Sequence, residues 1–315
     1  MKIFITGIRG FVGSHLAQSL QEIGHDVRGI DNLMHPAFKP VHFNYGDVRY
    51  PADIEKFVEW SDVVVHLAAQ IHVDKSIENP QETIDINIGG TLNVLEACRR
   101  YGKRLVFAST SEVYGTSKRS IMDEDHPTDA QSPYGASKLG ADRLCKAYHD
   151  TYGLDVRILR NFNIFGPYQN AGSYGAVISI FTKAALEGKP LNIFGDGEQE
   201  RDYMYIDDAL KAYNIVMFTD DLNGVVLNCG SGKTVTINEV AKSIIKITAS
   251  KSDIVHISAR PGEVRRLCAG VGLIKKYGFS PSTDFYKDLS NYIKWYEELG
   301  DWSRSSWERL SRSII

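Results

Sequence analysis

Short apolar runs alternate with amphipathic segments along the first half of the chain. Residues 2–6 are a short run of β-branched and aromatic residues, and residues 26–30 are predicted to form a second strand. Residues 61–67 are almost continuously apolar, which is typical of a strand covered on both faces. His66, inside this third run, is therefore expected to be a packed core histidine. Residues 14–24 instead place apolar side chains at helical spacing and end at a glycine, as helices often do. Strands that alternate with helices predict an α/β fold with a Rossmann-type, doubly wound parallel sheet.

The pattern changes halfway along the chain. Before that point it also predicts a strand at 41–45, a helix over 80–101 and a strand at 103–108. Beyond it, loops punctuated by glycine and proline separate the apolar segments. We therefore expect a sheet domain over residues 1–165 and a smaller lobe, mainly for substrate binding, over residues 166–315. Helices of this second half are predicted at 174–188 and 237–248 and short strands at 191–193 and 225–229, while 301–315 carry no readable motif.

Composition narrows the class of protein. The chain has 315 residues, of which 43% are apolar and 24% charged, with a net charge of −3 and a pI near 6.3. These values are ordinary for a soluble globular protein and provide no basic field for nucleic acid or an anionic membrane. No apolar run reaches the about 18 residues of a membrane span. The four cysteines lack metal-ligand spacing and the N-terminus lacks a signal-peptide pattern, so we expect a cytoplasmic protein with reduced thiols and no metal.

A glycine-rich loop joins the first predicted strand to the first predicted helix. Gly7, Gly10 and Gly13 repeat at intervals of three, and glycines at such a turn let the backbone approach a pyrophosphate. The N–H groups at the start of the following helix, at Phe11 and Val12, can bind that anion. The motif alone is weak evidence, but its place between a strand and a helix favours a dinucleotide site.

Two aspartates at strand ends predict how the adenosine half of the dinucleotide is held. Asp31 follows the second strand, about twenty residues past the glycines, where a carboxylate accepts from the ribose hydroxyls; the alternative is a turn-forming residue before Asn32. Its charge would repel a 2′-phosphate, so NAD is predicted over NADP. Asp47 could reach an adenine edge or be an ordinary surface side chain. Further predicted cofactor contacts are Asn32, Val48, the segment Leu67, Ala68 and Ala69, the helical Asn87, and Ser109.

The segment SPYGASK places a tyrosine and a lysine four residues apart at the start of a predicted helix. Tyr134 and Lys138 therefore share one helix face. An ammonium beside a phenol favours the phenolate, which predicts that the pKa of Tyr134 falls from about 10 toward the working pH and makes it a general base. The alternative is an exposed pair on a surface helix. Thr110, after the fifth strand, adds a hydroxyl that could bind a substrate alcohol and orient its proton toward Tyr134.

Several segments together resemble the extended short-chain dehydrogenase/reductases that modify nucleotide sugars, a family that includes UDP-glucose 4-epimerases, 4,6-dehydratases and UDP-glucuronate decarboxylases. They are GIRGFVG, HLAAQ, TSEVYG, SPYGASK, RNFNIFGP, GDGEQERDYMYIDD and RPGEVRR. The resemblance implies that Thr110, Tyr134 and Lys138 are the catalytic set and that NAD is tightly held. It also implies a UDP-sugar substrate, a homodimer, and a return of the chain to the cofactor domain near 205–230. The implied substrate contacts are Asn163, Arg201 and Arg260, with Ser111, Val177 and Tyr203 as further candidates.

The resemblance implies a reaction that begins at C4 of the sugar. Tyr134 takes the proton of the C4 hydroxyl, the hydride goes to NAD, and a transient 4-keto sugar results. Glu112 stands where family members that handle a C5 proton carry an acidic residue, which points to a dehydratase or decarboxylase. Against that, Ser111 replaces the aspartate of dTDP-glucose 4,6-dehydratases, and residues 172–178 look like those of 4-epimerases. We therefore predict a 4-epimerase; the alternatives are a dehydratase or decarboxylase, a net reductase, and a non-catalytic NAD-binding regulator.

Overall fold

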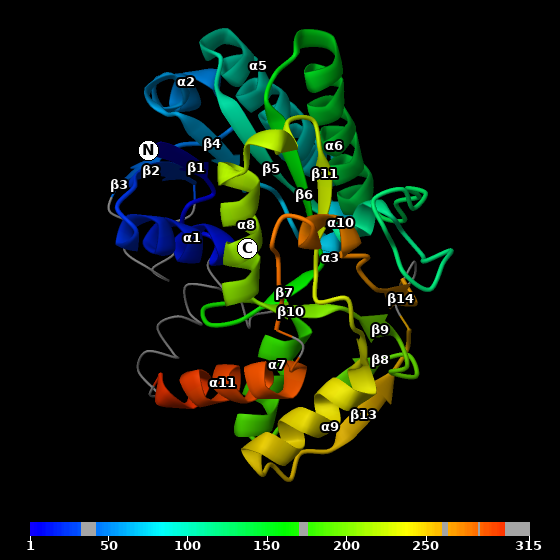
Figure 1. The fold of residues 1–315 in the computed structure, drawn as a ribbon. Helices are drawn as coiled ribbons and strands as arrows, with labels where there is room; N and C mark the ends of the chain where they lie inside the picture. The colour runs from blue at the N-terminus through cyan, green and yellow to red at the C-terminus, as the bar shows by residue number, and fades with distance from the viewer. Residues whose placement is uncertain (33–41, 170–175, 260–263, 283, 300–315) are drawn as a thin grey trace.

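The computed structural model describes residues 1–32, 42–169, 176–259, 264–282 and 284–299. Seven parallel strands form its central sheet, in the order β11-β6-β5-β4-β1-β2-β3 (Figure 1). The predicted α/β class and doubly wound parallel sheet are therefore confirmed. The strands are β1 (Lys2–Thr6), β2 (Asp26–Asp31), β3 (His42–Tyr45), β4 (Val63–His66), β5 (Arg104–Thr110), β6 (Val156–Asn161) and β11 (Val226–Cys229).

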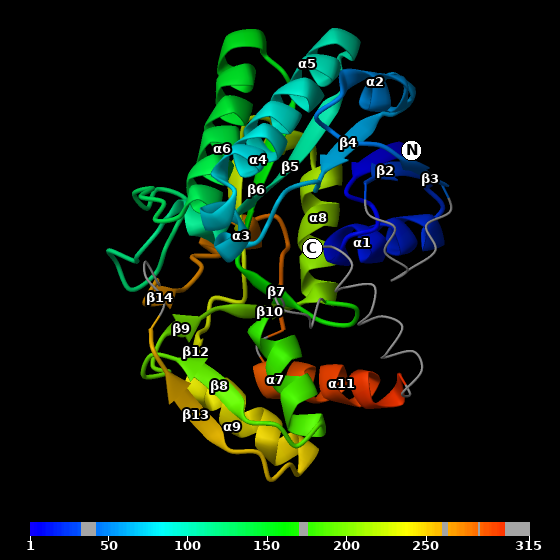
Figure 2. The same cartoon turned by 180° about the vertical axis from the view of Figure 1, so that it is seen from behind.

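Helices cover both faces of this sheet (Figures 1 and 2). Ile3 and Ile5 of β1 pack in one apolar cluster with helices α1 and α8, whereas Phe4, between them, packs in a second cluster with α2, α5 and α6. Successive side chains of a strand point to opposite faces, so a strand covered on both sides must be apolar throughout. The helices are α1 (Phe11–Glu22), α2 (Pro51–Trp60), α5 (Thr91–Tyr101), α6 (Pro133–Tyr152) and α8 (Ile206–Phe218).

The helix predicted over 80–101 is interrupted by a wider turn. It consists of α4 (Pro80–Ile84), a π-helical segment η1 (Asp85–Gly90) and α5. The Thr91 hydroxyl donates to the carbonyl oxygen of Asn87 at 2.6 Å, which satisfies one backbone acceptor within the irregular turn. Such π segments are rare and often occur at functional sites. Periodicity alone does not reveal one, because the apolar spacing on either side stays helical.

A lobe beside the sheet has its own apolar cluster (Figure 1). Its helices are α7 (Val177–Leu186), α9 (Ile237–Thr248) and α11 (Phe285–Glu298). Thr236 and Glu239 form a capping box at the start of α9, where the sequence predicts the helix to begin. Residues 174 and 175 of the helix predicted at 174–188 lie outside the described residues. The remaining elements that bear on the site are α3 (Val73–Glu78), η2 (Ser111–Val113), β7 (Asn163–Phe165), β8 (Leu191–Phe194), β9 (Glu200–Arg201), β10 (Tyr203–Tyr205) and α10 (Gly272–Lys275).

The second half of the chain contributes to the sheet layer as well as to the lobe. β11 pairs in parallel with β6, with Val226 opposite Ile158 and Cys229 opposite Asn161. Helix α8 packs on the same face as α1. The chain therefore passes from the sheet to the lobe and back, which places residues from both halves at one edge of the sheet.

His66 is a packed core histidine, as predicted. Its Nδ1 lies 2.7 Å from the Thr6 hydroxyl and its Nε2 lies 3.0 Å from the Thr91 hydroxyl. Burial, helped by the nearby charge of Lys138, lowers the pKa of His66 to about 3. The ring is therefore neutral at physiological pH and joins β1 to α5.

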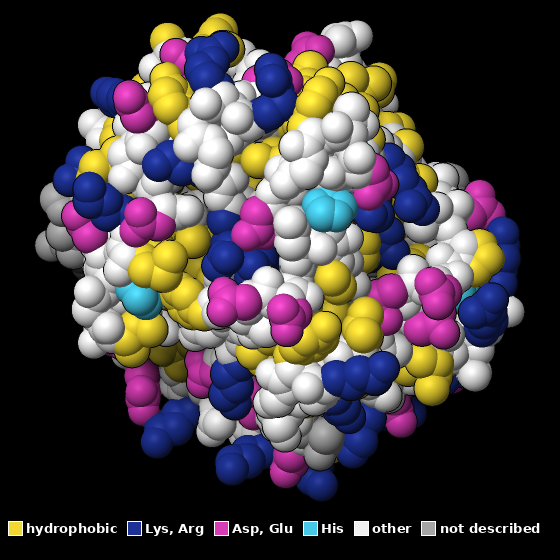
Figure 3. Space-filling view, turned by 45° about the horizontal axis from the view of Figure 1, so that its top comes forward, with side chains coloured by type: hydrophobic (Ala, Val, Ile, Leu, Met, Phe, Trp, Pro, Cys, Tyr) yellow, Lys and Arg dark blue, Asp and Glu magenta, His cyan; other side chains and the backbone are white. Residues whose placement is uncertain are grey.

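Among the residues that the structure describes, no helix is both long enough and apolar enough to cross a membrane. On the face drawn in Figure 3, basic and acidic side chains are interspersed. This distribution agrees with the small net charge of −3. A protein that binds nucleic acid without sequence preference instead gathers its lysines and arginines on one face.

Candidate active site

The glycine loop lies at a crevice of the sheet. β1 stands between β4 and β2, so the chain reverses its direction of travel across the sheet at this point, where open α/β sheets bind ligands. Gly7 has φ +73°, and a Cβ there would lie 2.8 Å from the Ala68 nitrogen. A Cβ on Gly13 would lie 2.2 Å from the Gly7 carbonyl oxygen. Both positions therefore require glycine, because the backbones approach more closely than a side chain allows.

The first turn of α1 is open toward this crevice. Gly10 is the N-cap, and no side chain of the described residues caps the helix there. The N–H groups of Phe11 and Val12 have no partner within the helix, which leaves them for an anion at the positive end of the helix dipole. A pyrophosphate fits this cradle of glycines and uncapped N–H groups.

Asp31 lies where the ribose of a dinucleotide is expected. It ends β2 at the same sheet edge, is 6% exposed, and its Oδ2 accepts from the Arg9 backbone N–H at 2.9 Å. The Asp47 carboxylate nearby is held by Arg49 at 2.6 Å and by the Asn32 side chain at 3.2 Å. An adenine contact by Asp47 stays a prediction, and it would share the carboxylate with the Arg49 guanidinium.

Some of the other predicted cofactor residues line a cavity, and others pack or form hydrogen bonds within the protein. Leu67, Ala69 and Ser109 line a cavity of about 350 Å³ together with Lys138. Val48 is buried, and its side chain fills the space that a Cβ on Gly90 would need. The Asn87 amide is engaged within the protein: its oxygen accepts from the Gln70 backbone, and its nitrogen donates to the Gln70 carbonyl and the Ser137 hydroxyl.

The proposed catalytic residues meet in this same cavity. Tyr134, Lys138 and Thr110 all line it, although they come from α6 and from the end of β5. Ser132 caps α6 by accepting the Gly135 N–H at 3.0 Å, and the Tyr134 N–H donates to the Ser76 hydroxyl at 3.0 Å. The start of α6 is thus held rigidly. The Tyr134 hydroxyl is hydrogen-bonded to Thr110, whereas the predicted contact of Thr110 with a substrate alcohol stays a prediction.

The predicted fall of the Tyr134 pKa is wrong for the protein without ligands. Burial raises the pKa of Tyr134 to about 12; the hydrogen bond from Thr110 opposes this and the charge of Glu112 adds to it. Lys138 does not reverse the shift; burial also lowers the pKa of Lys138 itself, to about 8. That ammonium lies 4.2 Å from the centre of the Phe107 ring. Spacing along a helix predicts proximity, but desolvation depends on what covers the pair.

Glu112 lines this cavity and interacts through charge with Arg201, which lines a second cavity. It lines the cavity beside Ser111, and burial raises the pKa of its carboxyl while the charge of Arg201 opposes that shift. Arg201 lines an adjoining cavity of about 260 Å³ with Val177 and Tyr203. Asn163 lines both cavities, and its Nδ2 is buried without a hydrogen-bond partner among the described residues. A buried amide donor without a partner is costly, so a ligand oxygen would satisfy it.

Several lining residues were not predicted. Asn161 and Phe162 stand in the RNFNIFGP segment, so the motif could have identified them, whereas Ile71 and Tyr213 have no sequence signal that singles them out. Tertiary contact alone brings those two to the cavity. Arg260, the second predicted arginine, lies outside the described residues. No cluster of three or more metal-ligating side chains occurs among the residues the structure describes.

Comparisons with known proteins agree on one family. The model of the NAD dependent epimerase/dehydratase family matches residues 3–230. The UDP-N-acetyl-alpha-D-glucosaminuronate decarboxylase of Bacillus cytotoxicus is 34% identical, with 95% of this chain and 98% of the relative covered. The UDP-glucuronate 4-epimerase of Thermodesulfobacterium geofontis is 32% identical, with 93% and 95% covered. The structure of the Thermus thermophilus UDP-glucose 4-epimerase in complex with NAD has a TM-score of 0.88 at 30% identity, with 94% and 99% covered.

These likenesses extend over nearly the whole chain and include enzymes that act on nucleotide sugars. The glycine cradle, the uncapped start of α1 and Asp31 fit the dinucleotide that the solved relative contains. The predicted cofactor, NAD, and the predicted resemblance are both confirmed. This chain belongs to the NAD dependent epimerase/dehydratase family.

Proposed function

We propose that the chain is a UDP-sugar 4-epimerase that works through a transient 4-keto sugar. The observation that carries this proposal is that Thr110, Tyr134 and Lys138 line one cavity, which adjoins the Arg201 cavity through Asn163. A sugar in the first cavity can therefore be attached to a nucleotide diphosphate in the second. Relatives that carry out 4-epimerisation on UDP-sugars support the same reading.

Three residues of the first cavity, Thr110, Tyr134 and Lys138, have roles in oxidation of the C4 hydroxyl. Thr110 holds the phenol of Tyr134, which accepts the C4 proton. In this role the phenol must be deprotonated to accept the proton, and the positive charge of Lys138 favours that form against the burial that raises the pKa of Tyr134. NAD, when bound, supplies the hydride acceptor at C4, and its positively charged ring also favours the phenolate. The residues at the glycine loop and Asp31 would hold that cofactor with its reactive ring toward the cavity.

The second cavity is suited to the nucleotide part of the substrate. Arg201 supplies a positive charge for the diphosphate, and the Asn163 amide supplies a donor that is otherwise without a partner. Phe194 and Tyr203 line the same cavity and offer aromatic surface to a base. These contacts, together with that of Arg260, would anchor UDP while the sugar ring turns between the two hydride transfers.

Among the described residues that line the cavity, Glu112 has no second carboxyl beside it. Elimination needs a base for the C5 proton and an acid for the departing C6 hydroxyl. Of the described residues that line the cavity, Glu112 is the acidic one, and Ser111 occupies the neighbouring position. A serine hydroxyl is a poor proton donor to a leaving group, so the geometry favours epimerisation over dehydration.

Decarboxylation is the second candidate, and Glu112 is the observation that favours it. Its carboxyl faces the same cavity as Tyr134, and burial raises its pKa, so it can carry a proton closer to neutral pH than an exposed glutamate. A proton carrier beside the sugar could return a proton to C5 after loss of carbon dioxide from a uronic acid. One relative is a decarboxylase of this kind of substrate.

A panel of UDP-sugars in heavy water separates these reactions. A 4-epimerase gives a product of unchanged mass with C4 inverted and no solvent deuterium on carbon, and it consumes no added cofactor. Loss of carbon dioxide with deuterium at C5 would establish the decarboxylase instead, and net consumption of NADH would establish a reductase. If no sugar is converted, the non-catalytic alternative stands.

Glu112→Gln tests the same choice from the protein side. An epimerase breaks no C5–H bond, so this variant should lose much less than the about 10²-fold that removal of a general acid or base costs. If C5 chemistry occurs, the variant should stop after oxidation at C4 and accumulate enzyme-bound NADH, which is visible by its absorbance. Tyr134→Phe is the control, since it should abolish the first oxidation in either case.

We also propose a cytoplasmic homodimer, as the resemblance implies. Sedimentation of the full chain would measure its mass in solution. A monomer at micromolar concentration would contradict the dimer.

A further inference from the structure

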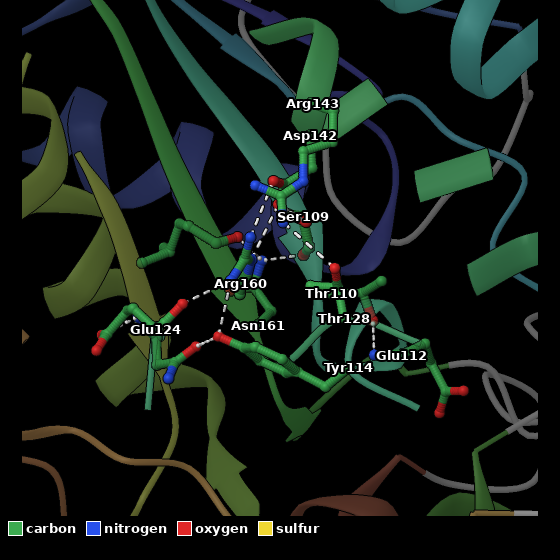
Figure 4. A network of polar contacts seen from close by, with 12 residues as sticks. Ser109, Thr110, Glu112, Tyr114, Glu124, Thr128, Asp142, Arg143, Arg160 and Asn161 are labelled. Carbon is green, nitrogen blue, oxygen red and sulfur yellow. Dashed lines mark hydrogen bonds and ion pairs between the residues drawn. The ribbon is translucent and has the colours of Figure 1, made fainter. Parts of the chain in front are cut away.

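Asp142 and Arg160 form a buried ion pair in the network of polar contacts that Figure 4 shows, and this network includes Ser109 of the cavity lining. Arg160 of β6 donates through Nε to Asp142 Oδ2 and through Nη2 to Asp142 Oδ1, each at 3.0 Å. The Ser109 hydroxyl of β5 donates to Asp142 Oδ2 at 2.7 Å. Asp142 and Arg160 are 1% and 2% exposed, and neither lines either of the two cavities.

The other side of the Arg160 guanidinium extends the contacts to two further segments. Its Nη1 donates to the Tyr114 hydroxyl at 3.0 Å and to the Glu124 carbonyl at 3.4 Å. The Tyr114 hydroxyl in turn donates to the Asn228 side chain at 2.7 Å, in β11. Arg160 of β6 therefore contacts α6 and the segment that follows η2, and through Tyr114 it is linked to β11, which lies much further along the sequence.

Three members of this network, Ser109, Asp142 and Arg160, lie in the cavity wall or near cavity residues on the same element. Asp142 is on the same face of α6 as Lys138, one turn further along. Ser109 precedes Thr110, and Arg160 precedes Asn161, and these two pairs are opposite each other in the β5–β6 register. The network thus connects α6, which carries Tyr134 and Lys138, to β5, which carries Thr110.

Charge supports the same conclusion. Asp142 and Cys145 on α6 face Lys138 and favour its charged form, against burial, which lowers the pKa of Lys138 to about 8. From β4, the neutral His66 faces the same ammonium, and from β5 the Phe107 ring does. Among these groups Asp142 carries the formal negative charge, and that charge favours the protonated form of Lys138.

We propose that Asp142 and Arg160 are positioning residues that set α6 against β5 and β6 so that Tyr134 and Lys138 face Thr110. This inference rests on the proposed function, because it assigns the three cavity residues their catalytic roles. A buried ion pair can often be replaced by apolar residues of similar volume without loss of stability. Stability alone therefore does not require this pair, whereas its forked geometry fixes direction as well as distance.

The test compares the double variant Asp142→Leu/Arg160→Met with a matched control on the same strand. Arg157 of β6 is also buried and is paired with Asp155 at 2.9 Å, but it lies at the other end of the strand, away from both cavities. Arg157→Met leaves Asp155 paired with Arg104. The substrate probe is UDP-glucose with NAD, or the panel member that the unmodified chain converts, at temperatures where circular dichroism shows each variant folded.

A positioning role predicts a change in kcat that is separate from KM. The double variant should lose at least about tenfold in kcat with KM within threefold, while Arg157→Met keeps both near those of the unmodified chain. Asp142→Asn should also move the alkaline limb of the kcat profile to lower pH, because Lys138 loses the charge that favours its protonated form. Equal kcat in the double variant and the control would overturn the proposal.

Two further variants keep the test decisive. If the double variant does not fold, Tyr114→Phe removes one hydroxyl from Arg160 and should lower kcat at least threefold at constant KM; an unchanged kcat would overturn the proposal. Tyr134→Phe separates this inference from the proposed function. If Tyr134→Phe keeps full turnover, the catalytic assignment fails, whereas if it is inactive and the double variant is fully active, only the positioning role fails.

Discussion

Gly13→Ala is the substitution whose effect follows most directly from the geometry of the cofactor cradle. The added Cβ would lie 2.2 Å from the Gly7 carbonyl oxygen and 3.0 Å from the Ile8 Cα. A van der Waals contact needs about 3.5 Å, so α1 and the loop after β1 must separate by more than about 1 Å. These neighbours are backbone atoms, and no side-chain rotation can relieve the contact.

The displacement acts on both stability and binding. Overpacking of this kind costs about 1–3 kcal/mol. It also moves the N–H groups of α1 relative to the loop, so they cannot reach one pyrophosphate together. We expect the Kd for NAD to rise at least about tenfold, which is about 1.4 kcal/mol of binding free energy.

Calorimetric titration with NAD and thermal unfolding with and without NAD measure the two effects. Gly272→Ala is the matched control, since a Cβ at the start of α10 meets no atom within 4 Å. It should leave the NAD affinity unchanged. Gly13→Ala with an affinity within twofold of the unmodified chain would refute the argument that this close contact forms the cofactor cradle.

Two further predictions concern charge. Lys138→Met should abolish turnover yet stabilise the fold by about 3 kcal/mol at pH 7, because burial lowers the pKa of Lys138 from 10.5 to about 8 and each pKa unit is about 1.4 kcal/mol. Between those two pKa values the folded chain binds fewer protons than the unfolded chain, so the stability of the unmodified chain rises from pH 8 to 10.5. The stability advantage of the Lys138→Met variant therefore shrinks over that range. A difference in the free energy of unfolding that does not change with pH, measured with denaturant, would contradict this. NAD should bind at least about tenfold more tightly than NADP, because Asp31 repels a 2′-phosphate. In competitive titrations, Asp31→Asn should narrow the ratio of the NADP and NAD dissociation constants. Equal affinities of the unmodified chain for NAD and NADP would disprove the assignment of Asp31 to the ribose.

Local pattern determined the sheet layer and the cofactor cradle of this protein. The almost continuously apolar run at 61–67 predicted a strand covered on both faces, and it contains β4, with Val63, Val64 and Val65 buried. The spacing of Gly7, Gly10 and Gly13 predicted a turn whose close backbone contacts the structure then shows. These features are readable because their physical cause lies within a few residues of the chain.

Tertiary structure decided what depends on segments far apart in sequence. Residue spacing predicted that Tyr134 and Lys138 lie close together, but the sign of the Tyr134 pKa shift depends on the burial that packing of α6 against β5 and α3 imposes. The partnership of Asp142 with Arg160 across α6 and β6 carries no mark in either segment. The two adjoining cavities likewise exist only where β7 crosses from sheet to lobe. Desolvation and paired charges are properties of the packed interior, and a one-dimensional pattern does not contain the distances on which they depend.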